Sequence, residues 1–176
     1  CDVQKESEIK NAVHRCTKVL GHIDIMIANA GVGHSTPAYA PDSRLFETTI
    51  KTNVLGALYT FNAVIPDMLA RQSGQLVSIS SLASYRGMPE AAAYSASKAA
   101  LSTLTESFRL DLKPHGIAVT LINPGYIESP MTDRNDYYMP FLMSTDTGVK
   151  RIYTAIEKRK SIVSFPFPLS WLVRSL

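Results

Sequence analysis

Three short apolar runs, each closing on a polar or glycine-containing turn, constrain the fold of this chain more than any other feature. They are rich in Ile, Val and Leu, as buried strands are, and they lie at residues 23–28, 75–80 and 117–122. A fourth short strand is expected at 161–165, and the segments with helical character lie at 5–20, 42–72, 90–113 and 146–158. Strands that alternate with helices pack as a parallel sheet with helices on both faces. The sequence therefore predicts an α/β fold with a doubly wound parallel sheet.

The composition indicates one ordinary globular domain and argues against several classes of protein. The 176 residues are 45% hydrophobic and 19% charged, and a chain of this length buries about 70% of its unfolded surface. A net charge of +3 is too small to indicate a nucleic-acid partner. The two cysteines, Cys1 and Cys16, make no disulfide framework, which predicts reduced thiols and a cytoplasmic location. The histidines lack metal-ligand spacing and no apolar run reaches the ~20 residues of a bilayer span, so neither a metal site nor a transmembrane segment is expected.

The pentapeptide Tyr94-Ser95-Ala96-Ser97-Lys98 is the strongest chemical signal in the chain. Residues i and i+4 share one face of a helix, so the ammonium of Lys98 is expected beside the phenol of Tyr94. A neighbouring cation stabilises a phenolate and lowers the tyrosine pKa from its ordinary value of ~10. The pair therefore predicts an acid–base tyrosine, although a solvent-facing helix can carry the same pair by chance.

Other polar residues follow or interrupt the predicted elements in a consistent way. Ser81 directly follows the strand 75–80, and a hydroxyl there lies at the edge where open α/β sheets bind ligands. The turns Asn29-Ala30-Gly31 and Asn123-Pro124-Gly125 follow two other strands. Asn53 falls in the middle of the helical stretch 42–72, where its low helix propensity calls for a specific role.

Taken together, these motifs resemble the short-chain dehydrogenases/reductases, in particular their single-domain branch. The matching elements, in the order of the family, are Asp2-Val3, Asn29-Ala30-Gly31, Asn53, Ser81, Tyr94 to Lys98, and Pro124-Gly125-Tyr126-Ile127-Glu128-Ser129. The resemblance covers the chain from residue 2 to about residue 165. It implies that residues 1–176 form a single Rossmann-like domain, N-terminally truncated because the first β-α-β-α-β segment of the family, with its glycine-rich turn, is absent. We therefore expect this chain to be part of a longer one.

The resemblance implies hydride transfer between a nicotinamide and the carbon of a carbonyl or secondary alcohol. Tyr94 exchanges a proton with the substrate oxygen, and Ser81 hydrogen-bonds the same oxygen. Lys98 holds the pKa of Tyr94 down and binds the nicotinamide ribose. Asn53 bends its helix and binds a water that connects Lys98 to solvent.

The implied cofactor is NADP or NAD, and no residue in this chain predicts which of the two it is. By resemblance, Asp2 and Val3 contact the adenine, and Asn29-Ala30-Gly31 serves the adenosine side. Pro124 and Gly125 let the chain pass close to the nicotinamide, while the Ile127 amide and the Ser129 hydroxyl meet its carboxamide. Tyr94 and Lys98 complete the set of cofactor contacts.

The partners implied are a small carbonyl or alcohol substrate and further copies of the same chain. Residues 126–145 are polar and aromatic with poor periodicity, and by resemblance they form the mobile substrate loop. A homodimer or homotetramer is expected through the helical stretches 42–72 and 90–113. The apolar tail 165–174 could pack on the core, line a subunit contact or touch a membrane surface, and packing is the preferred interpretation.

Two other functions are compatible with some of these features. A cofactor-less binding or scaffold protein would use the same fold without the pyrophosphate turn. Sugar epimerases and dehydratases share the Tyr-x-x-x-Lys motif, but they carry a longer substrate domain than the roughly 50 residues that follow Pro124.

Overall fold

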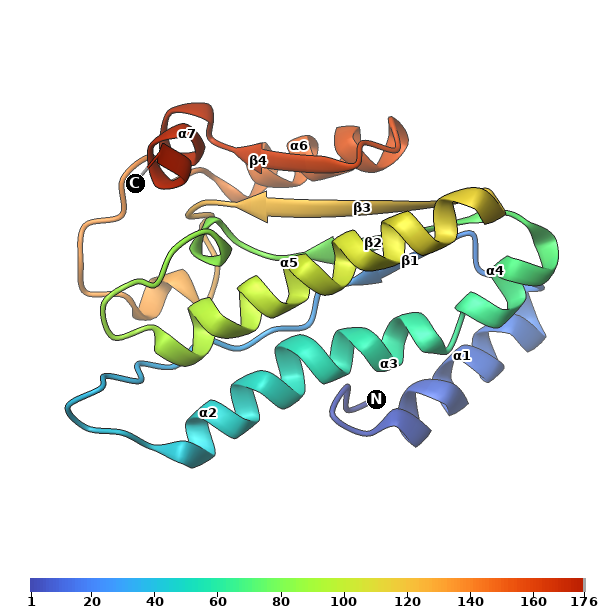
Figure 1. The fold of residues 1–176 in the computed structure, drawn as a ribbon, viewed down its shortest axis with the longest axis horizontal. Helices are drawn as coiled ribbons and strands as arrows, with labels where there is room; N and C mark the ends of the chain where they lie inside the picture. The colour runs from blue at the N-terminus through green and yellow to red at the C-terminus, as the bar shows by residue number, and fades with distance from the viewer. Residues whose placement is uncertain (176) are drawn as a thin grey trace.

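Four parallel strands form the centre of the molecule (Figure 1). The computed structural model describes residues 1–175. The strands are β1 (Ile25–Ala28), β2 (Gly74–Ile79), β3 (Ile117–Pro124) and β4 (Ile162–Phe165), and they lie side by side in chain order. All three pairs of neighbours are parallel, with Met26 opposite Leu76 and Leu76 opposite Val119. The predicted α/β class and parallel sheet are confirmed.

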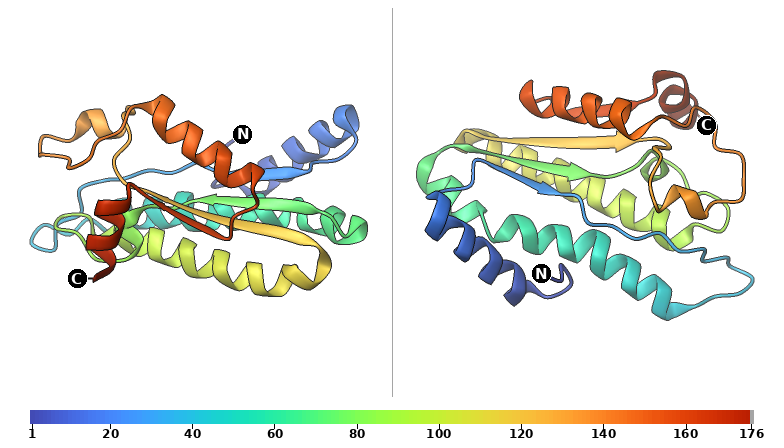
Figure 2. Two further views of the ribbon diagram at one scale, coloured as in Figure 1. Left: turned by 90° about the horizontal axis from the view of Figure 1, so that it is seen from above. Right: turned by 180° about the vertical axis from the view of Figure 1, so that it is seen from behind.

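The sheet is covered by helices on both faces. The helices are α1 (Glu6–Leu20), α2 (Ser43–Ile50), α3 (Gly56–Asn62), α4 (Ile65–Arg71), α5 (Ala92–Leu112), α6 (Thr145–Glu157) and α7 (Phe167–Ser175). Figure 2 shows α5 and α6 on opposite sides of the strands. Successive strand residues point to opposite faces, and accordingly Leu76 belongs to the core cluster that contains Leu101 of α5, while Val77 belongs to the one that contains Ala155 of α6. The structure thus has the two-sided core of a doubly wound fold.

The helical stretch 42–72 is divided more than the sequence indicated. Asp42 begins α2 as a side-chain cap, accepting hydrogen bonds from the amides of Arg44 and Leu45. A π-helical turn at Lys51–Leu55 separates α2 from α3, and a break after Asn62 separates α3 from α4. Pro66 stands at the second position of α4, where its missing amide hydrogen costs no helical hydrogen bond.

The apolar tail folds back onto the molecule as α7. Leu169 and Val173 are buried with Leu82, and the partly buried Tyr85 and Tyr126 pack against them. This contact confirms the expectation that the tail packs on the core. In the part of the chain that the structure describes, no helix combines the length and apolar character of a membrane span.

Candidate active site

The residues of the Tyr-x-x-x-Lys motif, Asn53 and the turn after β1 meet at the carboxyl edge of the sheet. Tyr94 lies in the first turn of α5 and Lys98 one turn later. A Cβ added to Gly31 would lie 3.4 Å from both the Asn53 Oδ1 and the Lys98 Nζ. Because Gly31 has no side chain, the turn after β1 can approach these two side chains closely. Gly31, Asn53 and Lys98 thus lie together, as the sequence predicted.

Asn53 connects three segments by its side chain. It is 1% exposed, accepts a hydrogen bond from the Val32 amide at 2.8 Å, and donates to the Val32 carbonyl at 2.9 Å and to the Ser97 hydroxyl at 2.9 Å. The Ser97 hydroxyl in turn donates to the Tyr94 carbonyl at 2.7 Å. Asn53 lies within the π-helical turn. Its hydrogen bonds to Val32 and Ser97 explain why an unfavourable helix former occupies this position. Its water-binding role stays a prediction.

Lys98 is a buried cation with a fixed position. It is 4% exposed, and its ammonium donates a 2.8 Å hydrogen bond to the carbonyl of Ile79 at the end of β2. The ammonium lies 5.7 Å from the centre of the Tyr94 ring. Burial disfavours the charged form and lowers the pKa of Lys98 to about 8. The Lys98 ammonium is therefore held in place, and its pKa lies near neutral pH.

The pKa of Tyr94 differs in direction from the sequence-based expectation. Burial, the largest cause, raises it above the ordinary tyrosine value, the neighbouring Ser81 hydroxyl lowers it, and Tyr137 raises it further. Lys98 does not reverse this, since its ammonium is directed at the Ile79 carbonyl rather than at the phenol oxygen. In this structure Tyr94 is therefore a protonated acid at neutral pH.

Serine hydroxyls support the site on the β2 side. Ser81 caps the short turn Leu82–Ser84 by accepting a hydrogen bond from the Ala83 amide at 3.1 Å, which fixes the position of its hydroxyl. Ser80 donates to the Lys98 carbonyl at 3.0 Å and so joins β2 to α5. Neither Ser80 nor Ser97 was predicted from the sequence to belong to the site. Their only signal was their position, immediately before Ser81 and three residues after Tyr94.

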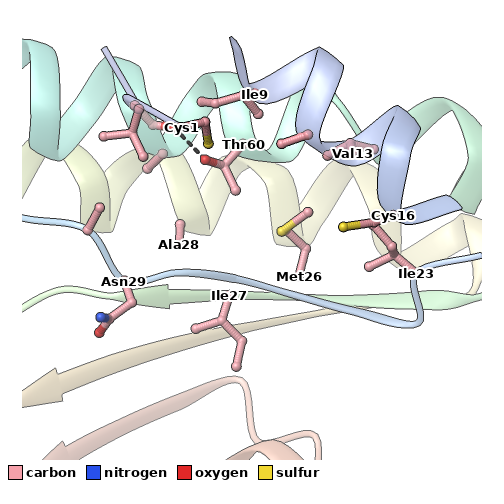
Figure 3. Close-up of a pocket in the computed structure, with 15 residues that line it drawn as sticks. Cys1, Ile9, Val13, Cys16, Ile23, Met26, Ile27, Ala28, Asn29 and Thr60 are labelled. Carbon is pink, nitrogen blue, oxygen red and sulfur yellow. Dashed lines mark hydrogen bonds between the residues drawn. The ribbon is translucent and has the colours of Figure 1, made fainter. Parts of the chain in front are cut away.

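A pocket of about 260 Å³ lies between α1, α3 and β1, and it includes several of the residues predicted to contact the adenosine. Val3, Asn29 and Ala30 are among its lining residues (Figure 3). Ala28 and Met26 point toward the helices, whereas Ile27 and Asn29 point to the other side of the strand. Asp2 is not among the lining residues, and its carboxylate accepts a hydrogen bond from the Gln4 amide at 3.0 Å. The roles of these residues toward a cofactor stay predictions.

The predicted nicotinamide side follows β3, and its residues make contacts of their own. The Gly125 amide donates to the Phe165 carbonyl at 2.7 Å, and a Cβ added to Gly125 would approach Pro166 and Leu169 at 3.1 and 3.2 Å. Gly125 thus permits the close approach of α7, which is a different use from the one the resemblance implied. Ile127 pairs with Met143 across the ends of the loop 126–145, and the Ser129 hydroxyl lies 3.2 Å from that of Thr132. Pro124 ends β3.

An aromatic pair from the loop 126–145 stands near Tyr94. The rings of Tyr126 and Tyr137 lie edge to face with their centres 6.3 Å apart. Burial, together with Tyr137 and Tyr94, raises the pKa of Tyr126 to about 12. Met131 from the same loop also approaches Gly33, where an added Cβ would lie 3.7 Å from its sulfur and 3.3 Å from the Tyr94 ring. The predicted substrate loop therefore brings apolar and aromatic groups toward the phenol of Tyr94.

The burial of Lys98 predicts a pH-dependent stability. Its pKa is about 8 in the folded protein and 10.5 unfolded, so between these values the unfolded chain binds more protons and stability rises with pH. A Lys98→Met protein lacks this contribution. We expect the stability of Lys98→Met relative to the wild type to be highest below pH 8. This difference should then shrink as pH rises to about 10, because the wild type gains stability there.

Urea unfolding from pH 7 to pH 10 measures this difference. Substitution of Met for the exposed Lys113 is the matched control, and its unfolding curves should run parallel to those of the wild type. A Lys98→Met difference that stays constant across the range would contradict a depressed lysine pKa.

Comparisons with known proteins agree on one family. The model of the family described as short chain dehydrogenase matches residues 1–137. An uncharacterized oxidoreductase of Myxococcus xanthus is 43% identical over 169 residues, which cover 96% of this chain and 67% of that protein. The structure of a gluconate 5-dehydrogenase from Burkholderia cenocepacia in complex with NADP and tartrate matches with a TM-score of 0.72 and 29% identity, over 75% of this chain and 52% of that one.

A further solved structure, ElxO with NADP bound, matches with a TM-score of 0.84 over 93% of this chain and 74% of that one. At 23% identity this likeness shows the fold alone, and it confirms the predicted Rossmann-like architecture. Across the three proteins the chain spans between 52% and 74% of the other protein's length. It therefore corresponds to part of each of them, as the resemblance implied.

Proposed function

The chain belongs to the short-chain dehydrogenase family, and from that premise we propose that the protein is an NAD(P)-dependent oxidoreductase. It transfers a hydride between the nicotinamide and the carbon of a small carbonyl or secondary alcohol. One observation carries the proposal: Tyr94, Lys98 and Asn53 lie together at the carboxyl edge of the sheet, with Lys98 buried and its ammonium fixed by a hydrogen bond. This is the edge at which open α/β sheets bind ligands.

Tyr94 is proposed to move the proton. With its pKa raised, the phenol is protonated at neutral pH, so it holds the proton that a carbonyl oxygen takes up when a hydride reaches its carbon. The Ser81 hydroxyl, fixed by its cap on the following turn, is proposed to hold that oxygen near the phenol. The Tyr126 and Tyr137 rings are proposed to line the substrate side.

Lys98 and the pocket beside α1 fit a nicotinamide dinucleotide. The ammonium of Lys98 has three hydrogens, and in the part of the chain that the structure describes it donates to the Ile79 carbonyl, which leaves capacity for a ribose hydroxyl. The lining of the pocket is mostly apolar and includes Val3 and Ala30, which suits an adenine ring. The NADP complex of the gluconate 5-dehydrogenase supports the same assignment. The cofactor is proposed to be NADP or NAD, and it supplies the hydride.

The oligomer and the compartment are also proposals. A homodimer or homotetramer is proposed through α2, α3 and α5, of which α2 and α5 carry the exposed apolar residues Phe46 and Leu110. A cytoplasmic location is proposed because Cys1 and Cys16 are both free thiols.

Titration of the full-length protein with NADPH and with NADH, followed by cofactor fluorescence, tests the proposed function. Saturable micromolar binding, and oxidation of the bound cofactor on addition of members of a carbonyl panel, are expected. A folded protein that binds neither cofactor would overturn the proposal and favour the cofactor-less scaffold. Binding without turnover of any carbonyl or alcohol would overturn the reaction and leave nucleotide binding in place.

A further inference from the structure

The loop 31–41, which follows the turn after β1, is joined to the segment that enters α5. The Thr36 amide donates to the Glu90 carbonyl at 2.6 Å, and Thr36 pairs in parallel with Ala91. Thr36 itself is 7% exposed. Thr36 thus packs against Ala91, 55 residues later in the sequence, at the beginning of the helix that carries Tyr94 and Lys98.

The helix α5 begins without a cap from its own segment. The residue at the cap position is Ala91, which has no side-chain acceptor, although the first amides of a helix lack intrahelical partners. The hydroxyl of Thr36 fills this role, because it accepts a hydrogen bond from the Ala93 amide at 3.0 Å. Threonine is a favoured capping residue when it precedes a helix, and here it caps from a distant loop. The capped amide belongs to the residue immediately before Tyr94.

Glu90 holds the loop in place at the cost of a disfavoured backbone conformation. Its φ of 55° lies in the left-handed region, which glycine adopts more easily than glutamate. The Glu90 carboxylate accepts hydrogen bonds from the hydroxyls of Tyr39 and, at 3.3 Å, Ser35. Both donors belong to the loop 31–41. Glutamate at this strained position is therefore explained by its side chain, which ties the loop to the entrance of α5.

The same loop also contacts the ring of Tyr94. A Cβ added to Gly33 would lie 3.3 Å from the Tyr94 Cδ2, so the backbone at Gly33 lies close against the ring. The loop thus meets Tyr94 at its ring and at the amide of the residue before it. These two contacts act on the position of the phenol without involving its oxygen.

We propose that Thr36 is a positioning residue for Tyr94: its hydroxyl caps α5 from the loop 31–41, and Glu90 anchors that loop. The proposal rests on the proposed function, in which Tyr94 carries the proton. Loss of the cap frees the first turn of α5, and a phenol displaced by a fraction of an ångström transfers its proton less efficiently. Cofactor affinity should be unaffected, because Lys98, the proposed ribose contact, lies beyond the first turn of α5 and is held by the Ile79 carbonyl.

The test compares Thr36→Val, which keeps the shape and removes the hydroxyl, with Thr36→Ser, which keeps the hydroxyl. In the full-length protein we expect Thr36→Val to lower kcat about tenfold, with the KM for NADPH unchanged, and Thr36→Ser to restore most of the rate. Thr154→Val, at an exposed threonine of α6, is the matched control and should leave kcat unchanged. Equal kcat values for Thr36→Val and the wild type would overturn the positioning role.

Amide hydrogen exchange gives a readout that does not depend on catalysis. The Ala93 and Tyr94 amides should exchange about tenfold faster in Thr36→Val and return toward the wild-type rate in Thr36→Ser. Unchanged exchange would show that the hydroxyl does not cap α5 and would overturn the proposal. If the Ala93 amide exchanges faster in Thr36→Val but the wild type itself shows no oxidoreductase activity, the cap is confirmed and the proposed function is overturned.

A second variant tests the anchor separately. Glu90→Gly relieves the strain of the left-handed backbone, which by itself would stabilise the protein. It also removes the two carboxylate oxygens that accept hydrogen bonds from Ser35 and Tyr39. We expect instead that the Thr36 amide exchanges faster and that kcat falls in the same direction as in Thr36→Val. A Glu90→Gly protein with wild-type kcat and exchange would show that the loop is held without Glu90.

Discussion

A Tyr94→Phe protein is expected to keep NADPH binding, because the Lys98 ammonium stays fixed by the Ile79 carbonyl, and to lose about 10²- to 10⁴-fold in kcat. The substitution removes only the phenol oxygen. The contacts of the ring with the backbone at Gly33 and with the ammonium of Lys98 do not use that oxygen, so they remain. The variant therefore separates proton transfer from the shape of the site. Steady-state rates with a carbonyl substrate, beside fluorescence titration with NADPH, measure the two effects.

The matched control is Tyr153→Phe. Tyr153 is exposed on α6, where its hydroxyl donates to Glu157 at 2.7 Å, and no proposed role involves it. Its kcat should equal that of the wild type. If Tyr94→Phe kept more than about a tenth of the wild-type kcat, proton transfer would have to come from another group, and the reaction proposed here would be wrong.

The strands were predictable from sequence because their signal is local. Runs of Ile, Val and Leu between turn residues indicated β2 and β3 to within two residues, and the structure places both in the middle of the sheet. The division of 42–72 was not predictable to the same extent. The π-helical turn contains Asn53, and Asn53 is held by Val32, which lies 21 residues earlier. Per-residue propensity carries no information on such a contact.

The helix α7 shows the same limit. The segment from Phe165 to Pro168 has prolines at alternate positions, which argues against a helix. In the structure Pro168 falls in the first turn of α7, where proline is tolerated, and Leu169 and Val173 are buried against Leu82. Tertiary packing thus decides the conformation of this segment.

The site divides in a similar way between local and tertiary information. The sequence placed Tyr94 and Lys98 one helical turn apart, and the structure has them so. The lowered Tyr94 pKa predicted from the pair was wrong in direction, because burial by other segments raises that pKa. The cap from Thr36 was also beyond the sequence, since Thr36 and Ala93 are 57 residues apart.

Substitution of Asn53 by alanine is expected to lower the free energy of unfolding by about 2–4 kcal/mol. The change leaves the part-buried Val32 amide and carbonyl without their Asn53 partner, and it removes the donor to the Ser97 hydroxyl, which still donates to the Tyr94 carbonyl. Each polar group that stays buried without a partner costs about 1–3 kcal/mol. We also expect kcat to fall, since Ser97 connects Asn53 to the backbone of Tyr94.

The exposed Asn62, at the end of α3, supplies the matched comparison. Both Asn53→Ala and Asn62→Ala replace a weak helix former with the strongest one, a gain of about 0.5 kcal/mol that is common to the two proteins. The difference between their urea unfolding curves therefore measures what the buried Asn53 side chain contributes through its hydrogen bonds and its packing. Asn62→Ala should match or exceed the stability of the wild type, whereas equal stabilities of the two variants would show that the Asn53 network contributes nothing to folding. In that case the π-helical turn would have to be held by the packing of α2 and α3 against α5 alone.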